Sequence, residues 1–349
     1  MIFRRRRSNE KTVNLALQGG GAHGAFTWGV LDRLLEDSRL QIEGVSGTSS
    51  GAMNAAALAS GLAAGGREAA RATLARFWTE MSAAVPDGLK QRNPLALWSG
   101  DLGIEAFPAL KAYLDLARVL SPAQLNPLDL NPLREVLLRV IDFDRLTTTA
   151  TPRLFISATN VHTGKVRIFA NREITVDALL ASACLPSIHR AVEIGGELYW
   201  DGGYSGNPPV FPLIFNCRAP DIVVVMAQPL RRTDTPASPE AIQRRQAELS
   251  FNTAFLREMR AIAMCKAQIE EGGWFPTGRL ERRLARLKLH LIEAEGLLRS
   301  LGPGSHFNTE MSFLTRLRDA GRDHTQAWLA TNFDALGERS TVDMEALFL

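Results

Sequence analysis

Along the first 65 residues, short runs of apolar residues alternate with segments in which apolar residues recur at helical spacing. The run Val13–Leu17 predicts a short strand that stops at a glycine cluster. Within Ala25–Asp37 the apolar residues recur about once per helical turn, which places them on one face of a helix. Ile42–Ser46 predicts a second strand, and the small residues of Ala52–Leu62 predict a second helix. This alternation indicates an α/β fold with three layers, α/β/α, around a mainly parallel central sheet.

Further strands and helices are expected after residue 150. The expected strands are Arg153–Thr159, Val166–Ala170, Asp221–Met226 and Leu287–Ile292. The expected helices are Thr175–Ala183, a long one from Pro239 to about Glu271 with Ser238 as its N-cap, and a last one from Asn308 or Thr309 to about Phe333. The chain therefore divides into a main domain over 12–230 and a mostly helical extension, 231–349, that packs on the same domain.

The segment 82–133 differs from the rest of the main domain. It holds six prolines and few charges. Because proline lacks the backbone donor and breaks a helix interior, short helices joined by loops are expected, forming a helical cap or insertion. Two interpretations stay open: an ordinary peripheral subdomain, or an apolar lid over a binding site.

Charge is concentrated at the N-terminus. The 349 residues include 40 Lys+Arg and 37 Asp+Glu, a net charge of +3. Residues 1–11 alone carry +4, from Arg4–Arg7 and Lys11 against Glu10, so the remainder carries about −1. This distribution excludes a dedicated nucleic-acid binder and predicts a flexible basic tail, either solvated or attracted to anionic lipid.

Sequence features also bear on the compartment. No continuous apolar stretch follows Arg4–Arg7, so we expect no secretion signal. Residues 44–66 lack charge, but with six glycines and several polar residues they are too polar and too broken for a membrane-spanning helix, and none is predicted. The widely spaced Cys184, Cys217 and Cys265 indicate reduced thiols, with neither disulfides nor a metal site. We therefore expect a cytoplasmic protein.

The first motif is the glycine loop Gly19-Gly20-Gly21-Ala22-His23-Gly24, between the first strand and the first helix. Successive glycines expose backbone N–H groups at a helix N-terminus, where an oxyanion or phosphate is stabilised. No Lys-Ser/Thr pair follows, so the loop is no P-loop. A dinucleotide site would need an acid at the end of the second strand, whereas Glu43 lies at its start. Nucleotide binding is thus a remote alternative.

The second motif, Gly47-Thr48-Ser49-Ser50-Gly51, matches G-x-S-x-G between a predicted strand and a predicted helix. This is the context of a nucleophile elbow, whose sharp turn strains the serine and needs small neighbours on both sides. Ser49 is therefore the predicted nucleophile, while Ser46 and Ser50 are interpreted as turn or cap residues.

A nucleophilic serine needs a base. The histidines that could serve are His162, His189, His290, His306 and His324, none in a distinctive context. Asp201 is followed by Gly202 and Gly203 after a short apolar strand, which predicts an exposed, uncrowded turn. From the residues alone, Asp201 could be a base or an ordinary turn residue.

Together these motifs resemble the patatin-like phospholipase family. The segment Ala181-Ser182-Ala183-Cys184-Leu185-Pro186 is similar to that family's Ala-Ser-x-x-x-Pro, and the resemblance covers at least 12–228. It implies a Ser49–Asp201 dyad without a catalytic histidine and without a metal or other cofactor. It also implies an oxyanion hole from backbone N–H groups of Gly19, Gly20, Gly21 and Ala22. The supporting motif residues are His23, Gly24, Gly47, Gly51, Gly202 and Gly203.

The resemblance implies a serine acyl hydrolase that releases fatty acid from (phospho)lipid acyl esters, in transient contact with the inner membrane face. Where the family often has Arg or Lys, this chain has His23, which removes a permanent charge and leaves anionic headgroup recognition open. A soluble carboxylesterase or acyl-thioesterase, and a catalytically silent lipid-binding module, are the alternatives. Three roles stay open for residues 231–349: they complete the core, cover the sheet, or form a self-association surface for a homodimer.

Overall fold

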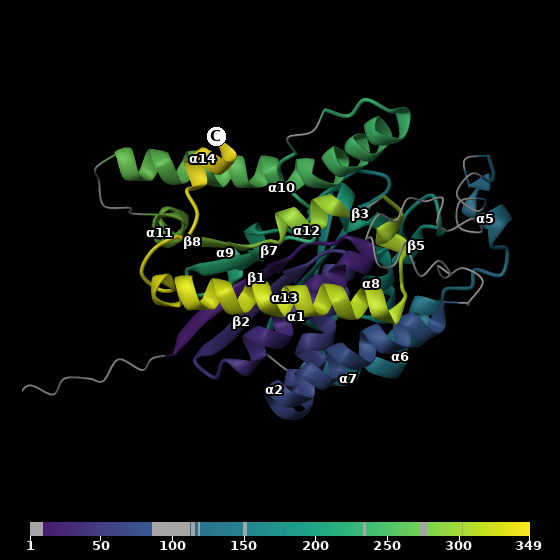
Figure 1. Ribbon diagram of the computed structural model, residues 1–349, viewed down its shortest axis with the longest axis horizontal. Helices are drawn as coiled ribbons and strands as arrows, with labels where there is room; N and C mark the ends of the chain where they lie inside the picture. The colour runs from purple at the N-terminus through teal and green to yellow at the C-terminus, as the bar shows by residue number, and fades with distance from the viewer. Residues whose placement is uncertain are drawn as a thin grey trace, which may run out of the picture.

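A computed structural model describes residues 10–85, 119–148, 152–232, 235–272, 278–301 and 303–349, together with residues 112, 116 and 117. Within these residues the strands are β1 (Lys11–Leu17), β2 (Leu40–Gly47), β3 (Arg153–Asn160), β4 (Val166–Ala170), β5 (Val192–Ile194), β6 (Glu197–Asp201), β7 (Asp221–Val225) and β8 (Lys288–Ile292). They form one sheet in the order β5-β6-β3-β2-β1-β7-β8, with β4 also paired to β3 (Figure 1). The core pairs β3-β2-β1-β7-β8 are parallel, and the β4, β5 and β6 pairings are antiparallel.

The described helices include short and long elements. They are α1 (Gly24–Glu36), α2 (Ser50–Ala84), α5 (Pro122–Leu125), α6 (Pro132–Val140), α7 (Phe143–Thr148), α8 (Val176–Ser182), α9 (Phe211–Asn216), α10 (Pro239–Glu271), α11 (Arg279–Arg286), α12 (Glu295–Ser300), α13 (Met311–Asn332) and α14 (Met344–Phe348). Short 3-10 turns are η1 (Gly21–His23), η4 (Asn171–Glu173), η5 (Gly202–Tyr204), η6 (Pro303–Phe307) and η7 (Phe333–Ala335).

Helices cover both faces of the sheet. In β1 the side chains of Val13, Leu15 and Leu17 point into one core, which α1, α2, α6, α8 and α13 cover, while Ala16 points into a second core under α9, α10, α11 and α14. The two helical layers are visible on opposite sides of the strands (Figure 1). Strand side chains alternate between faces, so a sheet buried on both sides needs apolar residues at nearly every position. The expected three-layer α/β/α fold is confirmed.

Most of the predicted elements occur close to their expected bounds. Strand β4 and helix α10 match the expectation, and the Ser238 side chain accepts a hydrogen bond from the Ala241 N–H at 3.1 Å as an N-cap. The start of α13 was predicted wrongly. Its N-cap is Glu310, because the Asn308 side chain instead accepts the Glu310 N–H at 3.0 Å, ahead of the helix.

Helix α2 is longer than the sequence pattern indicated. It continues from the predicted small-residue segment to Ala84, across a kink where Gly65 and Gly66 leave helical geometry. The first residues of the expected cap, 82–84, are thus the end of α2, and its last two, from Pro132, begin α6. Most of that cap, 86–111 with 113–115 and 118, lies outside the described residues.

The expected basic tail is described only at its end. Lys11 already belongs to β1, where it pairs with Leu40, so the sheet begins inside the stretch expected to be a tail. Residues 1–9, including Arg4–Arg7, lie outside the described residues. Among the helices of the described ranges, none combines the length and the apolar character that a membrane crossing requires.

Candidate active site

Ser49 lies in a sharp turn between β2 and α2. Its backbone has φ 53° and ψ −124°, a left-handed conformation that is strained for a residue with a side chain. The flanking glycines have no room for a side chain. A Cβ at Gly51 would lie 2.2 Å from the Leu17 carbonyl oxygen, and one at Gly47 would lie 2.6 Å from the Gly51 carbonyl oxygen. The turn therefore has the geometry of a nucleophile elbow, with the α2 N-terminus beneath Ser49.

Sheet register brings Asp201 to this turn. At Ile156, β3 pairs with the last residue of β2, Gly47, on one edge and with β4 on the other. At Ala158, β4 still pairs with the same edge of β3. The partner on the other edge of β3 is now Asp201 of β6, because β2 has already ended. Strand β6 therefore continues the row of β2 in the opposite direction, and Asp201 lies beside the turn that carries Ser49.

The Asp201 carboxylate is buried and hydrogen-bonded. Only 1% of the residue is exposed, so the prediction of an exposed turn at this position was wrong. The Gly203 N–H donates to its Oδ1 at 2.7 Å, and the Ser49 hydroxyl hydrogen-bonds its side chain. Burial raises the pKa of Asp201 to about 7, because desolvation of the charged form outweighs these two hydrogen bonds. A carboxyl group that titrates near neutral pH and contacts a serine hydroxyl can act as a general base.

Ser182 holds the backbone of Ser49 in place. Its hydroxyl accepts the Ser49 N–H at 2.9 Å, and the residue is fully buried at the end of α8. In the same segment, the Cys184 carbonyl oxygen accepts the Asp201 N–H at 2.8 Å. The sequence motif from Ala181 to Pro186 thus contacts both residues of the pair, although sequence reasoning noted the motif without giving Ser182 a role.

The glycine loop faces the same turn. The Gly19 N–H donates to the Asn207 side-chain oxygen at 2.7 Å, and the Gly20 N–H donates to the Ser50 hydroxyl at 3.0 Å. Within the described ranges, the N–H groups of Gly21 and Ala22 donate to no acceptor. These two amides are therefore available for a ligand, whereas those of Gly19 and Gly20 are engaged.

Comparisons with known proteins identify the family of this chain. Residues 15–214, more than half of the chain, match the family described as patatin-like phospholipase. The chain belongs to the patatin-like phospholipase family. Members of this family are typically lipid acyl hydrolases. A search of curated proteins found no match. Among solved structures, VipD from Legionella pneumophila is similar, with 16% identity and a TM-score of 0.44 over 94% of this chain and 67% of that one.

The histidines that the sequence offered as bases lie elsewhere in this patatin-like domain or in the extension that follows it. His290 contacts Asp221 at 3.0 Å, His162 contacts Glu197 at 3.6 Å, and His324 contacts the Ala320 carbonyl oxygen at 2.8 Å. Within the described ranges, no histidine hydrogen-bonds Ser49. A serine–histidine triad therefore has no support in this arrangement.

His23, the histidine of the glycine loop, is buried, with 3% exposed. Its Nδ1 lies 3.3 Å from the Ala227 carbonyl oxygen and its Nε2 lies 2.7 Å from the Ser305 hydroxyl. Burial holds its pKa well below the usual value, so the ring is neutral at neutral pH. The position that is often positive in the family is here uncharged, as the sequence indicated.

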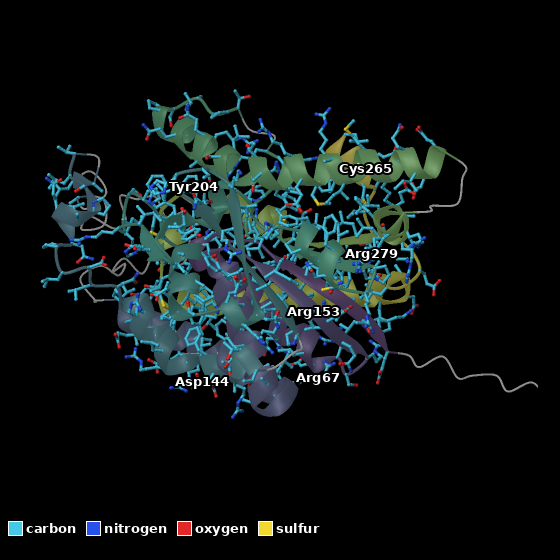
Figure 2. All side chains as sticks on the ribbon, turned by 180° about the vertical axis from the view of Figure 1, so that it is seen from behind. Arg67, Asp144, Arg153, Tyr204, Cys265 and Arg279 are labelled. Carbon is cyan, nitrogen blue, oxygen red and sulfur yellow. The ribbon has the colours of Figure 1, made fainter. Side chains whose placement is uncertain are left out.

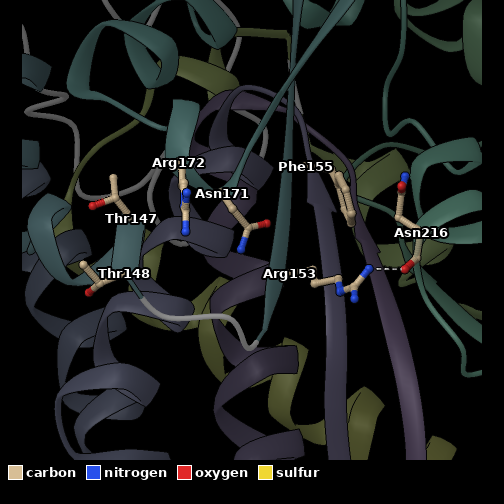
Figure 3. Close-up of a pocket in the computed structure, with 7 residues that line it drawn as sticks. All are labelled: Thr147, Thr148, Arg153, Phe155, Asn171, Arg172 and Asn216. Carbon is tan, nitrogen blue, oxygen red and sulfur yellow. Dashed lines mark hydrogen bonds between the residues drawn. The ribbon is translucent and has the colours of Figure 1, made fainter.

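One cavity of the patatin-like domain lies away from Ser49. It has a volume of about 380 Å³ and opens where β3 begins, lined by Thr147, Thr148, Arg153, Phe155, Asn171, Arg172 and Asn216 (Figure 3). Arg153 donates there to the Asn216 carbonyl oxygen. Tyr204, which ends η5 after Asp201, is well separated from Arg153 in Figure 2. Because ligands of parallel sheets bind at the carboxyl ends of the strands, the turn at Ser49 is the favoured site.

Proposed function

We propose that this protein is a serine acyl hydrolase that releases fatty acid from (phospho)lipid acyl esters. Ser49 is the nucleophile and Asp201 the base. The observation that carries the proposal is the contact of a serine hydroxyl, on a strained elbow, with a buried carboxyl group whose pKa is about 7. Such a base is half ionised at neutral pH, which is close to the optimum for proton transfer.

Acylation begins when the Ser49 Oγ attacks the ester carbonyl carbon and Asp201 accepts the hydroxyl proton. The carbonyl oxygen becomes an oxyanion, which the free N–H groups of Gly21 and Ala22 stabilise. Collapse of this intermediate breaks the bond to the alcohol oxygen, which leaves with the proton from Asp201. The product is an acyl ester of Ser49 and, from a diacyl phospholipid, a lysophospholipid.

Deacylation repeats the same steps with water. Asp201 removes a proton from the water as its oxygen attacks the acyl carbon, and the oxyanion again contacts Gly21 and Ala22. The Ser49 Oγ then leaves and takes the proton back from Asp201. Fatty acid is released and the free enzyme is restored.

Long-chain substrates of this reaction reside in membranes, so we also propose transient contact with a lipid surface. The arginines at the N-terminus support it, since each basic residue near an anionic surface contributes about 1 kcal/mol. No headgroup preference is proposed, because His23 is buried and uncharged.

The test is fatty-acid release by the purified protein, with Ser49→Ala as the blank. The substrates are a diacyl phospholipid, a lysophospholipid, a neutral glyceride, an acyl-CoA and a short soluble ester. We expect release from the membrane lipids by the wild type and, in Ser49→Ala, at most the roughly 10³-fold residual over water that binding and oxyanion contacts leave. Release confined to the soluble ester or acyl-CoA would indicate an esterase or thioesterase, and none at all a binding module.

A further inference from the structure

The C-terminal turn η6 contacts the glycine loop directly. His306 Nδ1 lies 2.9 Å from the carbonyl oxygen of Gly20, a residue 286 positions earlier in the chain. The neighbouring Ser305 hydroxyl lies 2.7 Å from His23 Nε2, and the rings of His23 and His306 are 3.9 Å apart between centroids. Ser305 and His306, the residues of η6 that make these contacts, lie outside the stretch that matches the family, which ends at residue 214.

The partners of the two rings fix where their protons are. A carbonyl oxygen only accepts, so His306 carries a proton on Nδ1 for Gly20, and His23 carries one on Nδ1 for Ala227. A neutral His23 then has Nε2 free to accept, and the Ser305 hydroxyl donates to it. The arrangement is therefore complete with both rings neutral.

The contact of His306 with the Gly20 carbonyl oxygen bears on the direction of the Gly21 N–H. The carbonyl of Gly20 and the N–H of Gly21 belong to one planar trans peptide unit, in which they point in opposite directions. The Gly20 oxygen accepts the His23 N–H at 3.2 Å and is also held by His306, so the Gly21 N–H is directed to the other side. Gly21 itself has φ +59°, and a Cβ there would lie 2.4 Å from the His306 carbonyl oxygen, so η6 packs tightly on the loop.

We propose that His306 is a positioning residue for the oxyanion hole: it orients the Gly20–Gly21 peptide so that the Gly21 N–H faces the substrate carbonyl, with Ser305 and His23 holding it in place. The C-terminal extension thereby completes the active site. This inference rests on the proposed function, because an oxyanion hole matters only if Ser49 attacks an ester.

Other charged groups near the rings do not alter this assignment. Glu248 of α10 raises the pKa of His306, and Arg232, which precedes that helix, lowers it. The two form an ion pair with each other at 2.6 Å. Burial lowers the pKa of both histidines. Because the ring centroids are only 3.9 Å apart, a proton on one ring disfavours a proton on the other, and both stay neutral at neutral pH.

The experiment is steady-state hydrolysis of a soluble 4-nitrophenyl acyl ester by the wild type, Ser49→Ala, His306→Ala and His306→Asn. Misplacing a catalytic group by about 1 Å can cost about 10²-fold, so His306→Ala is expected to lower kcat about 10- to 100-fold with KM changed less than about threefold. In His306→Asn the amide NH₂ takes the place of Nδ1–H, so most of kcat should return.

The matched control is His324→Ala. His324 also donates from Nδ1 to a backbone carbonyl, on α13, but it is exposed and does not contact the loop. Its substitution should leave kcat unchanged. Circular dichroism and thermal unfolding show whether each variant is folded. If His306→Ala does not fold, Ser305→Ala, which removes the hydroxyl that contacts His23, is expected to lower kcat about threefold to tenfold at unchanged KM.

The outcomes separate the two proposals. Wild-type hydrolysis that depends on Ser49, together with wild-type kcat in both His306→Ala and Ser305→Ala, refutes the inference alone. A loss in His306→Ala that His306→Asn does not restore also refutes it, because the donor would then not be what matters. If wild-type hydrolysis does not depend on Ser49, the proposed function fails and the inference falls with it.

Discussion

Replacing Asp201 with asparagine should stabilise the protein, and more at high pH than at low pH, while removing its activity. The pKa of Asp201 is raised from 3.8 to about 7, because burial penalises the charged form. The folded state therefore binds a proton that the unfolded state has lost between pH 4 and pH 7, and stability falls with pH across that window. At 1.36 kcal/mol per unit, the three-unit shift costs the wild type about 4 kcal/mol above pH 7.

Asparagine has nearly the same shape but no proton to lose, so it escapes this cost. Urea unfolding at pH 5.5 and pH 8 measures the effect. Between these values the wild type should lose about 2 kcal/mol relative to Asp201→Asn, since only the part of the window above pH 5.5 is crossed. The control is Asp323→Asn on the exposed side of α13, which makes the same substitution away from the Ser49 turn.

The reasoning would be refuted if Asp201→Asn differed from the wild type by the same amount at both pH values. Equal differences would mean that burial does not raise the pKa of Asp201. The proposal that Asp201 is a base with a pKa of about 7 would then have no support. Activity gives a second check, because full fatty-acid release by Asp201→Asn would exclude the Ser49–Asp201 dyad.

Three further predictions follow from the same site. The kcat/KM of the wild type should rise with pH through about 7 as Asp201 ionises and stay level above it; a midpoint below pH 5 would contradict the pKa of about 7. Ser182→Ala should lower unfolding stability by about 1 kcal/mol and kcat by about tenfold, because the half-buried Ser49 N–H loses its acceptor; unchanged kcat would show that this contact does not position Ser49. Gly51→Ala should prevent accumulation of folded protein, as its Cβ would lie 2.2 Å from a carbonyl oxygen, whereas Gly296→Ala on the exposed side of α12 should stabilise by up to about 1 kcal/mol; equal thermal unfolding of the two would refute the steric argument.

Much of the fold followed from local patterns. The strand Val166–Ala170 and the helix that Ser238 caps have the expected bounds, because periodicity and a capping side chain act within a few residues. The start of the last helix did not follow, because Asn308 and Thr309 both looked like N-caps, whereas the Asn308 side chain accepts the Glu310 N–H ahead of the helix. The β5–β6 hairpin was only half expected, since three-residue strands carry too short a pattern to be read.

The sequence by itself determined the local chemistry of the site. A glycine on each side of Ser49 is a steric requirement of one sharp turn, so five consecutive residues were enough to predict the elbow. The family resemblance pointed to Asp201, but from the residues alone it could have been an ordinary turn residue.

Only the tertiary structure decided which distant groups meet at that turn. Asp201 reaches Ser49 because β6 takes the place beside β3 that β2 leaves, and this depends on sheet register. Ser182 contacts the Ser49 amide across 133 residues, and His306 contacts Gly20 across 286. Such contacts leave no periodic or spacing signal in the chain, because they arise from the packing of whole elements; a single hydroxyl or ring becomes part of the site only when the fold brings its element there.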